Sequence, residues 1–312
     1  MLTIPTTGFG RSVHAHNVDL DVFCDWIEGS VLFCGEGLSE PAVVDALCHH
    51  QIYDKQDMAH QMVSNGWSEL RKRQKMLGDV SPYAFDSLTI KLRRNPWDET
   101  PAHSFCVLLS LLKWYPQWAR TFGKDYTEQG QLFEELTKEA VETIYAGWTV
   151  RQTGWSRTQS NKLAAVVDIV SAWLNEAKGN VEKWTSTSAN EAGLDLVCYH
   201  EIADGRGGYP AFLFQCASGA NWDEKLHTPN LKIWTRIIEF RAQSLPTKAF
   251  ATPYAFLDAD FTRNCNLVDG LLLDRYRLLS AGLRRKDWVS NSLTKKIKKW
   301  AKGRVSKLPR IR

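Results

Sequence analysis

The chain has 312 residues, 44% of them hydrophobic, and a formal net charge of +4, values ordinary for a globular protein of one or two domains. The most apolar stretch, residues 105–114, is too short to cross a membrane, because a span needs roughly 20 apolar residues. Seven cysteines without a CxxC pair argue against a disulfide framework and a zinc ribbon, and no secretory leader is visible, so we expect a cytoplasmic protein.

The first region, residues 1 to about 120, is predicted to be mostly helical. Residues 19–29 have apolar side chains at helical spacing, and residues 57–77 form a longer helix with a basic stretch at its end. A strand pattern follows at residues 88–94. Short helices followed by a strand are compatible with a DNA-binding winged helix-turn-helix, and equally with any other small helical domain.

The second region, residues 121–283, alternates between helix and strand patterns. A polar segment at 123–130 has the composition of a loop. Then follow helices at 131–146 and 161–177, strands at 193–202 and 211–218, a bent helix at 220–240, a strand at 247–256 and, at 271–282, a helix or a buried strand-helix junction. The turn segment ADGRGGYP joins the first two strands into a hairpin. We therefore expect an α/β core with a mixed sheet.

The third region, residues 284–312, is strongly basic. It contains twelve Lys or Arg residues and one acid, Asp287, a net charge of +11, which leaves −7 of the total +4 for residues 1–283. Such asymmetry is typical of a tail that binds a polyanion, either nucleic acid or an anionic membrane surface, and the plain alternative is a solvated terminus. The candidate phosphate contacts are Lys295, Lys296, Lys298, Lys299, Lys302 and Arg304.

Two polar side chains interrupt the apolar strands of the predicted hairpin. Asp195 follows Leu194, and Gln215 follows Phe214. A charged group in apolar surroundings needs a partner or a metal, and a hairpin would bring these two side chains close together. Their oxygen atoms suit Mg²⁺, a hard cation. A metal held there could activate water and neutralise the charge on a phosphate.

The segments GLDLV and FLFQCASG resemble the catalytic hairpin of PD-(D/E)XK, or restriction-endonuclease-like, nucleases. In that superfamily an acid on one strand is followed by (D/E/Q)-x-K on the next, and an earlier helix often supplies a further acid. The resemblance implies that Asp195 is the first acid and Gln215 the second ligand of Mg²⁺ or Mn²⁺. It also implies Glu134 as the helix acid, with Glu191 as its alternative, and the carbonyl of Cys216 as a further ligand.

The lysine of this motif is missing, because the position two residues after Gln215 is Ala217. Some members of the superfamily carry this lysine on the following helix, and Lys225, in the segment NWDEKL, is the candidate here. Its long side chain could bring an ammonium group to the metal and stabilise the attacking hydroxide or the charge on phosphorus. If Lys225 does not reach the site, the resemblance implies an inactive nuclease fold.

The leading expectation is a Mg²⁺-dependent DNA endonuclease, with RNA as the less favoured substrate. The segments DGRGG and LLLDRYRL also resemble uncharacterised bacterial proteins of this type, some of them in phage-defence loci. Two alternatives stay open: an inactive DNA-binding or scaffold subunit, which Ala217 favours, and a protein that docks on a membrane through Trp288, Ile297 and Trp300. A protein partner that restrains or activates the nuclease, and an oligomeric state, are also left open.

Overall fold

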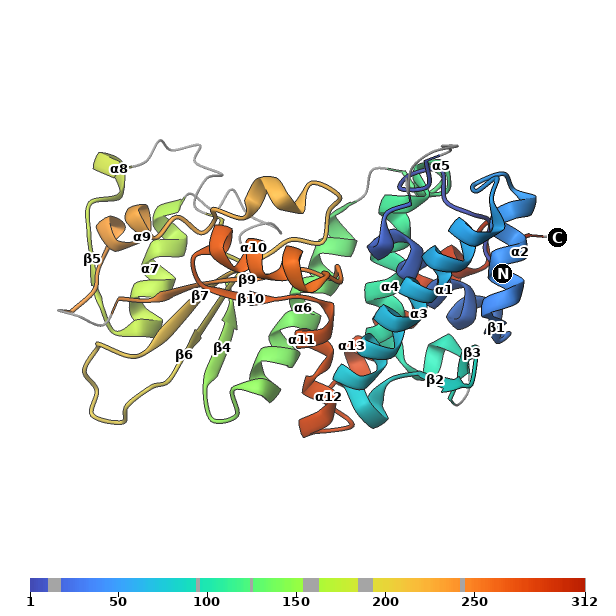
Figure 1. Ribbon diagram of the computed structural model, residues 1–312. Helices are drawn as coiled ribbons and strands as arrows, with labels where there is room; N and C mark the ends of the chain where they lie inside the picture. Colours follow the sequence, from blue (N-terminus) through green and yellow to red (C-terminus); the bar gives the residue numbers. More distant parts are fainter. Residues whose placement is uncertain are drawn as a thin grey trace. The chain divides into compact units, whose positions relative to one another are not determined.

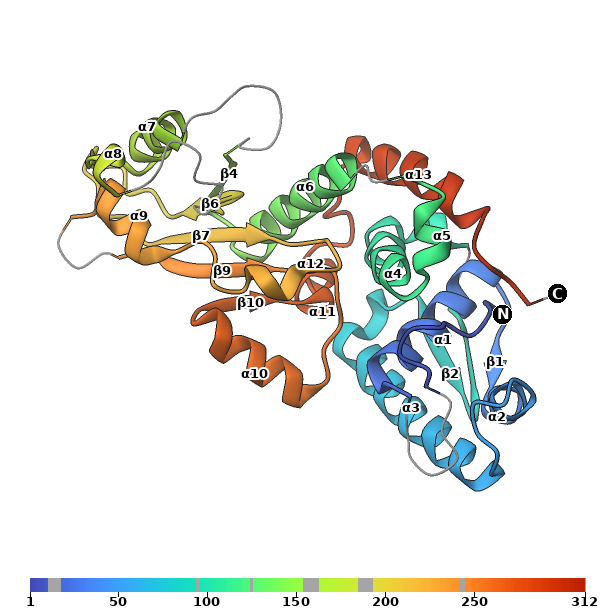
Figure 2. The ribbon, with the colours of Figure 1, turned by 90° about the horizontal axis from the view of Figure 1, so that it is seen from above.

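The computed structural model describes residues 1–10, 18–93, 96–123, 126–153, 163–184, 193–241 and 245–311 (Figures 1 and 2). The chain divides into two compact units. Unit 1 comprises residues 1–125, 253–255 and 282–312, and unit 2 comprises residues 126–252 and 256–281. Within the described ranges, every helix is too short or too polar to cross a membrane.

Unit 1 is mostly helical and contains a small antiparallel sheet of order β1-β3-β2. The expected helices at 19–29 and 57–77 and the expected strand at 88–94 are confirmed. The elements are α1 (Leu20–Cys34), β1 (Leu38–Ser39), α2 (Glu40–His49), α3 (Gln56–Leu77), β2 (Tyr83–Asp86), β3 (Thr89–Leu92), α4 (Pro101–Trp114), α5 (Pro116–Arg120), α12 (Ala281–Arg284), which begins at the unit boundary, and α13 (Asn291–Val305).

A buried ion network joins three helices of unit 1. The Arg73 side chain on α3 is 1% exposed, and its guanidinium lies 3.2 Å from Asp25 and 3.4 Å from Glu28 on α1. Asp25 also accepts a hydrogen bond from the Trp114 indole of α4 at 3.2 Å. Because a buried charge must be paired, this network fixes α3 relative to its two neighbours.

The basic C-terminal segment is a folded part of unit 1, and the expectation of an appended tail is corrected. Leu293, Ile297 and Trp300 lie on one side of α13 and are buried. The Trp300 ring meets Phe105 of α4 edge to face, with 5.0 Å between the ring centroids. The apolar spacing of three and four residues makes α13 an amphipathic helix, and its lysines occupy the outer side.

Unit 2 is built around a five-stranded mixed sheet of order β10-β9-β7-β6-β4. Strands β4, β6 and β7 pair antiparallel, whereas β7, β9 and β10 pair parallel. This confirms the expected α/β class with a mixed sheet. The strands are β4 (Thr149–Gln152), β6 (Leu196–Tyr199), β7 (Ala211–Cys216), β9 (Thr247–Ala251) and β10 (Leu271–Leu273).

Helices cover both faces of this sheet. Helices α7 and α9 share one buried core with Val197 and Leu213. Because side chains alternate along a strand, Phe212 points to the other face, where it packs against Tyr145 at the end of α6. The remaining elements of unit 2 are α6 (Tyr126–Ile144), α7 (Leu163–Leu174), β5 (Ala177–Lys178), α8 (Val181–Trp184), α9 (Leu231–Ile237), β8 (Ile238–Glu239), α10 (Asp258–Val268) and α11 (Arg275–Leu279).

Unit 2 differs from the sequence-based expectation at two places that matter for the site. Helix α6 begins at Tyr126, so residues 126–130, expected as a loop, form its first turns. The segment 220–240, expected as one bent helix, is a 3-10 turn at Trp222–Lys225 followed by the separate helix α9. The hairpin of β6 and β7 and the strand-helix junction after residue 271 are confirmed.

Candidate functional site

The hairpin of β6 and β7 places Asp195 opposite Gln215. Leu196 pairs with Phe214, and the Asp195 amide donates a 2.8 Å hydrogen bond to the Phe214 carbonyl, which continues the pairing by one residue. On the other side, the Thr153 amide donates to the Asp195 carbonyl at 3.0 Å. The backbone of Asp195 is therefore held between two neighbouring segments at the end of β6.

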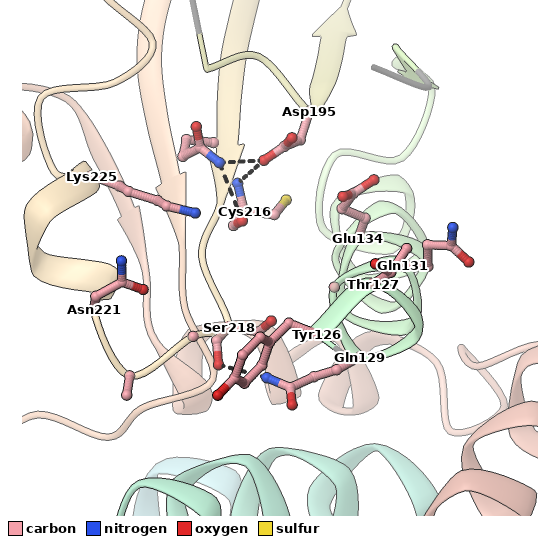
Figure 3. A pocket seen from close by; sticks show the side chains of 14 residues that line it. Tyr126, Thr127, Gln129, Gln131, Glu134, Asp195, Cys216, Ser218, Asn221 and Lys225 are labelled. Carbon is pink, nitrogen blue, oxygen red and sulfur yellow. Dashed lines mark hydrogen bonds between the residues drawn. The ribbon is translucent and has the colours of Figure 1, made fainter. Parts of the chain in front are cut away.

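The Asp195 carboxylate and the Gln215 amide are hydrogen bonded to each other (Figure 3). Oδ2 of Asp195 accepts from Gln215 Nε2 at 2.5 Å and from the Cys216 amide at 2.6 Å. The same Nε2 donates to the Cys216 carbonyl at 3.3 Å. These bonds fix the position of the carboxylate relative to the end of β7.

Both side chains line a cavity of about 710 Å³ in unit 2, together with Glu134 of α6 and Lys225 of the 3-10 turn. In Figure 3 the Glu134 carboxylate points toward the strand end that carries Asp195. The Lys225 ammonium enters from the other side and points toward Cys216. Glu134 is buried and Lys225 is exposed. All four residues selected from the sequence as catalytic thus lie at one cavity.

Two contacts of the 3-10 turn position Lys225. Trp222, at the start of the turn, is buried and packs against Phe256, with 4.9 Å between the ring centroids. The Lys225 carbonyl accepts hydrogen bonds from the amide of Thr228 at 2.9 Å and from its hydroxyl at 2.7 Å. Anchored at both ends, the turn brings a lysine that lies beyond β7 back toward the hairpin.

Thr228 also contacts the Gln215 amide, because its Oγ1 lies 3.1 Å from Gln215 Oε1. A hydroxyl has a single proton and two acceptor lone pairs. When that proton is donated to the Lys225 carbonyl, the Thr228 oxygen can accept a hydrogen bond. A rotated Gln215 amide would then donate Nε2 to Thr228, while its Oε1 would face the oxygens of Asp195 and Cys216, an arrangement that needs a cation between them.

The oxygen atoms of this site fit a hard divalent cation. They are the carboxylates of Asp195 and Glu134, the carbonyl of Cys216 and the amide oxygen of Gln215, a set that suits Mg²⁺ or Mn²⁺. In the structure the amide nitrogen of Gln215 faces Asp195, so a shared ion requires the amide to rotate. Among the described residues no three His, Cys, Asp or Glu side chains form a metal-binding group, so a cation at this cavity would also need the amide and carbonyl oxygens as ligands.

The alternative helix acid, Glu191, lies outside the described residues. Among the described residues, Glu134 supplies the helix carboxylate of the cavity; it stands on a regular helix and is 9% exposed. Glu134 is therefore the acid on which we base the site.

Sequence reasoning missed three features of the site. Gly193 has φ +39°, and a Cβ there would lie 2.6 Å from Gln215 Oε1 and 2.7 Å from Thr228 Cβ, so a side chain at this position would collide with both. Thr228 belongs to none of the sequence motifs described above. Gln129 of α6 is buried and donates to the Ser218 carbonyl at 3.1 Å, although its segment is polar enough to be read as a loop. Of these three features, only Gly193 gave a signal in the sequence, because a glycine opens the GLDLV segment two residues before Asp195.

The six candidate phosphate contacts all belong to the segment of α13 in unit 1. The exposed ones are Lys295, Lys296, Lys299 and Lys302, and Lys298 is half-buried. Arg304 has a packing role, because its guanidinium lies 3.8 Å from the ring centre of Trp300 and 4.9 Å from that of Phe122. Its Nη1 also donates to the Trp300 carbonyl at 2.9 Å. The exposed lysines therefore form the charged surface of α13, and Arg304 secures the helix.

No protein-family model, no curated protein and no solved structure matches the chain. The likeness to PD-(D/E)XK nucleases is therefore carried by the residues of the hairpin and by the side chains gathered around it. Asp195, Gln215, Glu134 and Lys225 all line the one cavity.

Thr228→Val is expected to weaken Mg²⁺ binding about tenfold, because the variant keeps the side-chain shape but cannot orient the Gln215 amide. Isothermal titration of Mg²⁺ into the full chain measures this change without any substrate. The matched control is Thr235→Val on α9, whose hydroxyl bonds the Leu231 carbonyl of its own helix at 2.8 Å. Equal Mg²⁺ affinity of the parent and Thr228→Val would contradict the proposed orienting role.

Proposed function

We propose that the chain is a Mg²⁺-dependent phosphodiesterase that cleaves DNA. The proposal is supported by the meeting of Asp195, Gln215, Glu134 and Lys225 at one cavity (Figure 3). These residues come from a hairpin, a helix and a 3-10 turn, so the fold gathers them from distant parts of the sequence. Two carboxylates, an amide and a lysine form the set that the PD-(D/E)XK likeness implies.

Each residue has a distinct task in this proposal. Asp195 and Glu134 would hold the cation, together with the amide oxygen of Gln215 and the carbonyl of Cys216. When bound, Mg²⁺ would help to deprotonate water and to neutralise charge on the phosphate. The Lys225 ammonium would stabilise the negative charge that grows on the attacked phosphate. The water oxygen would lose a proton to solvent and bond to phosphorus while the bond to the 3′-oxygen breaks and that oxygen takes up a proton from water, which leaves a 5′-phosphate and a 3′-hydroxyl.

The exposed lysines of α13 would hold DNA phosphates without reading the sequence. RNA is the second candidate substrate, and the assay below includes it. A protein partner that restrains the nuclease, and a role in phage defence, are expectations that the family likeness alone supports. A cytoplasmic location belongs to the same proposal.

A second function, a DNA-binding subunit without catalysis, is favoured by one observation. Ala217 stands where the motif has its lysine, and its side chain is 1% exposed, so the cavity depends on Lys225 for an ammonium group. The membrane-docking alternative loses its support, because Trp288, Ile297 and Trp300 are buried in unit 1. An interfacial helix would need those side chains on its outer face.

Metal removal tests the proposed activity. The purified 312-residue chain is incubated with plasmid, linear duplex DNA, single-stranded DNA and RNA, in Mg²⁺, in Mn²⁺ and in EDTA. We expect cleavage of DNA in Mg²⁺, no cleavage in EDTA, and recovery when Mg²⁺ is added in excess, because the oxygen set needs the cation. The products should carry 5′-phosphates that a ligase can join.

Several results would contradict the proposal. Cleavage that persists in EDTA, or products with 3′-phosphates, would require a different chemistry at this cavity. DNA binding without cleavage in either divalent metal would favour the second function, in which the fold serves as a binding subunit. Faster cleavage of RNA than of DNA would keep the chemistry and change the substrate.

A further inference from the structure

Helix α3 has one exposed polar face along its whole length. The exposed residues recur every three or four positions, the spacing of one side of a helix. They are Gln56, Asp57, His60, Gln61, Ser64, Asn65, Ser68, Arg71 and Lys75. Of the two acids of α3, Asp57 is exposed in the first turn, and Glu69 lies 3.6 Å from Lys72 and 3.5 Å from Arg73, so the charge of Glu69 is balanced by neighbours. The outer face of α3 is therefore rich in hydrogen-bonding groups and carries positive charge toward its C-terminal end.

The opposite face of α3 holds the helix rigidly in unit 1. Met62, Val63, Trp67 and Leu70 are buried there. Gly66 allows the Phe23 ring of α1 to approach so closely that an added Cβ would lie 2.1 Å from it. The Arg73 ion network described above adds a second anchor. Because α3 cannot turn on this core, its outer side chains keep a fixed direction.

The β2–β3 hairpin lies beside the C-terminal half of α3 and is bonded to it. The Trp67 indole donates to the Leu88 carbonyl at 3.1 Å, and the Arg71 guanidinium donates to the Ser87 carbonyl. The guanidinium also lies 4.5 Å from the centre of the Phe85 ring. The exposed tip of the hairpin, at Ser87 and Leu88, thus extends the surface of α3 on one side. Figure 2 shows α3 and β2 in the same part of unit 1.

The chemistry of this face selects among possible partners. An apolar partner is disfavoured, because polar side chains outnumber the two exposed large apolar ones, Met76 on α3 and Leu88 at the hairpin tip, among the described residues of this surface. Single strands are bound mainly by stacking on aromatic rings, and the Phe85 ring beside α3 is covered by Arg71. A helix is about 10–12 Å wide and fits the roughly 12 Å major groove of duplex DNA, whereas the corresponding groove of duplex RNA is deep and narrow.

We propose that the outer face of α3 binds in the major groove of duplex DNA and reads its sequence. Gln61, Ser64 and Asn65, in the N-terminal half, would contact base edges, for which amide and hydroxyl groups are suited. Lys75, toward the C-terminal end, would contact a phosphate. This surface is separate from the lysines of α13, and the proposal does not rest on nuclease activity, because such binding needs no metal.

Binding is measured with the 312-residue chain carrying Asp195→Ala, in EDTA, so that no DNA is cut. Fluorescence anisotropy with a labelled random duplex gives the affinity over a range of salt concentrations. Lys75→Gln is expected to weaken binding to all sequences and to lower the slope of log K against log salt by about one. Lys232→Gln, an exposed lysine on α9, is the matched control and should bind as the parent does.

Sequence reading is tested by selection of bound duplexes from a random pool. The parent should enrich a sequence motif, and Gln61→Ala with Asn65→Ala should lower the preference for that motif about tenfold or more while affinity for random DNA stays close to that of the parent. The proposal is overturned if the double variant enriches the same motif, or if Lys75→Gln keeps the parental affinity and salt slope. Tighter binding of duplex RNA or single-stranded DNA than of duplex DNA would also overturn it. Cleavage is not scored, so a failed nuclease proposal leaves these outcomes intact.

Discussion

Replacement of Asp195 by alanine is expected to lower the rate of DNA cleavage by at least 10²–10³-fold, on the order of the loss of one transition-state charge contact. The variant removes the proposed charged ligand, which is also the acceptor of two hydrogen bonds, from Gln215 and from the Cys216 amide. Asp195→Asn is the sharper change, because it keeps the shape and removes the negative charge. Both variants should also lose Mg²⁺ binding in titrations without substrate, a readout that does not depend on turnover.

The fold must be checked in the same experiment. A buried donor left without its acceptor costs about 1–3 kcal/mol, so the alanine variant should unfold at a lower temperature than the parent. The matched control is Asp204→Ala, an exposed acid in the turn of the same hairpin that pairs with Arg206 at 2.7 Å. If Asp195→Asn cleaves DNA as fast as Asp204→Ala in Mg²⁺, Asp195 is no metal ligand and the proposed chemistry is wrong.

The hairpin could be predicted because local rules determine it. Apolar strands around ADGRGGYP give antiparallel pairing, and side chains opposite each other in such a pair lie on the same face. Asp195 and Gln215 could therefore be placed together from sequence alone. The orientation of the Gln215 amide could not, because it depends on Thr228, which reaches the hairpin through the tertiary fold.

The C-terminal segment was expected to be a basic tail because of its high positive charge, whereas the structure has a helix there. Twelve basic residues suggested a tail, yet Leu293, Ile297 and Trp300 recur at helical spacing among them. A net charge summed over the whole segment combines the residues of both sides of the helix. The helical period of 3.6 residues assigns the apolar residues to one side and the lysines to the other. Trp300 is 3% exposed, so the apolar side belongs to the core of unit 1 and the lysines to its surface.

The start of α6 was misread for a related reason. The polar residues at 126–130 have the composition of a loop, but they form the first turns of this helix, and several of them line the cavity. Gln129 is buried and bonded to the Ser218 carbonyl, so its polar group faces protein and not solvent. Places where sequence rules fail in this way are often functional, which agrees with the position of these turns beside Glu134.

Lys225→Ala is the change that decides whether the missing motif lysine has a replacement. Because Lys225 is exposed and points into the cavity, the variant should keep its fold and its DNA affinity while it loses on the order of 10²–10³ in cleavage rate (Figure 3). Single-turnover rates at saturating Mg²⁺ isolate this step from binding. Lys225→Arg should recover little activity, because a planar guanidinium does not replace a compact ammonium. Lys232→Ala, an exposed lysine on α9, is the control for loss of a surface charge.

The double variant Ala217→Lys with Lys225→Ala tests whether the two positions serve the same point. Ala217 is buried, and its amide donates to the Ala251 carbonyl at 2.9 Å, so the new side chain would start from a fixed backbone position on the face that carries Gln215. We expect it to recover part of the rate lost in Lys225→Ala, provided that thermal unfolding shows a folded chain. If Lys225→Ala cleaves DNA as fast as Lys232→Ala while Asp195→Asn is inactive, the metal site stands and Lys225 is not the missing lysine. If instead Lys225→Ala is inactive and fully rescued by Ala217→Lys, the ammonium acts at one point of the cavity, whichever segment of the chain supplies it.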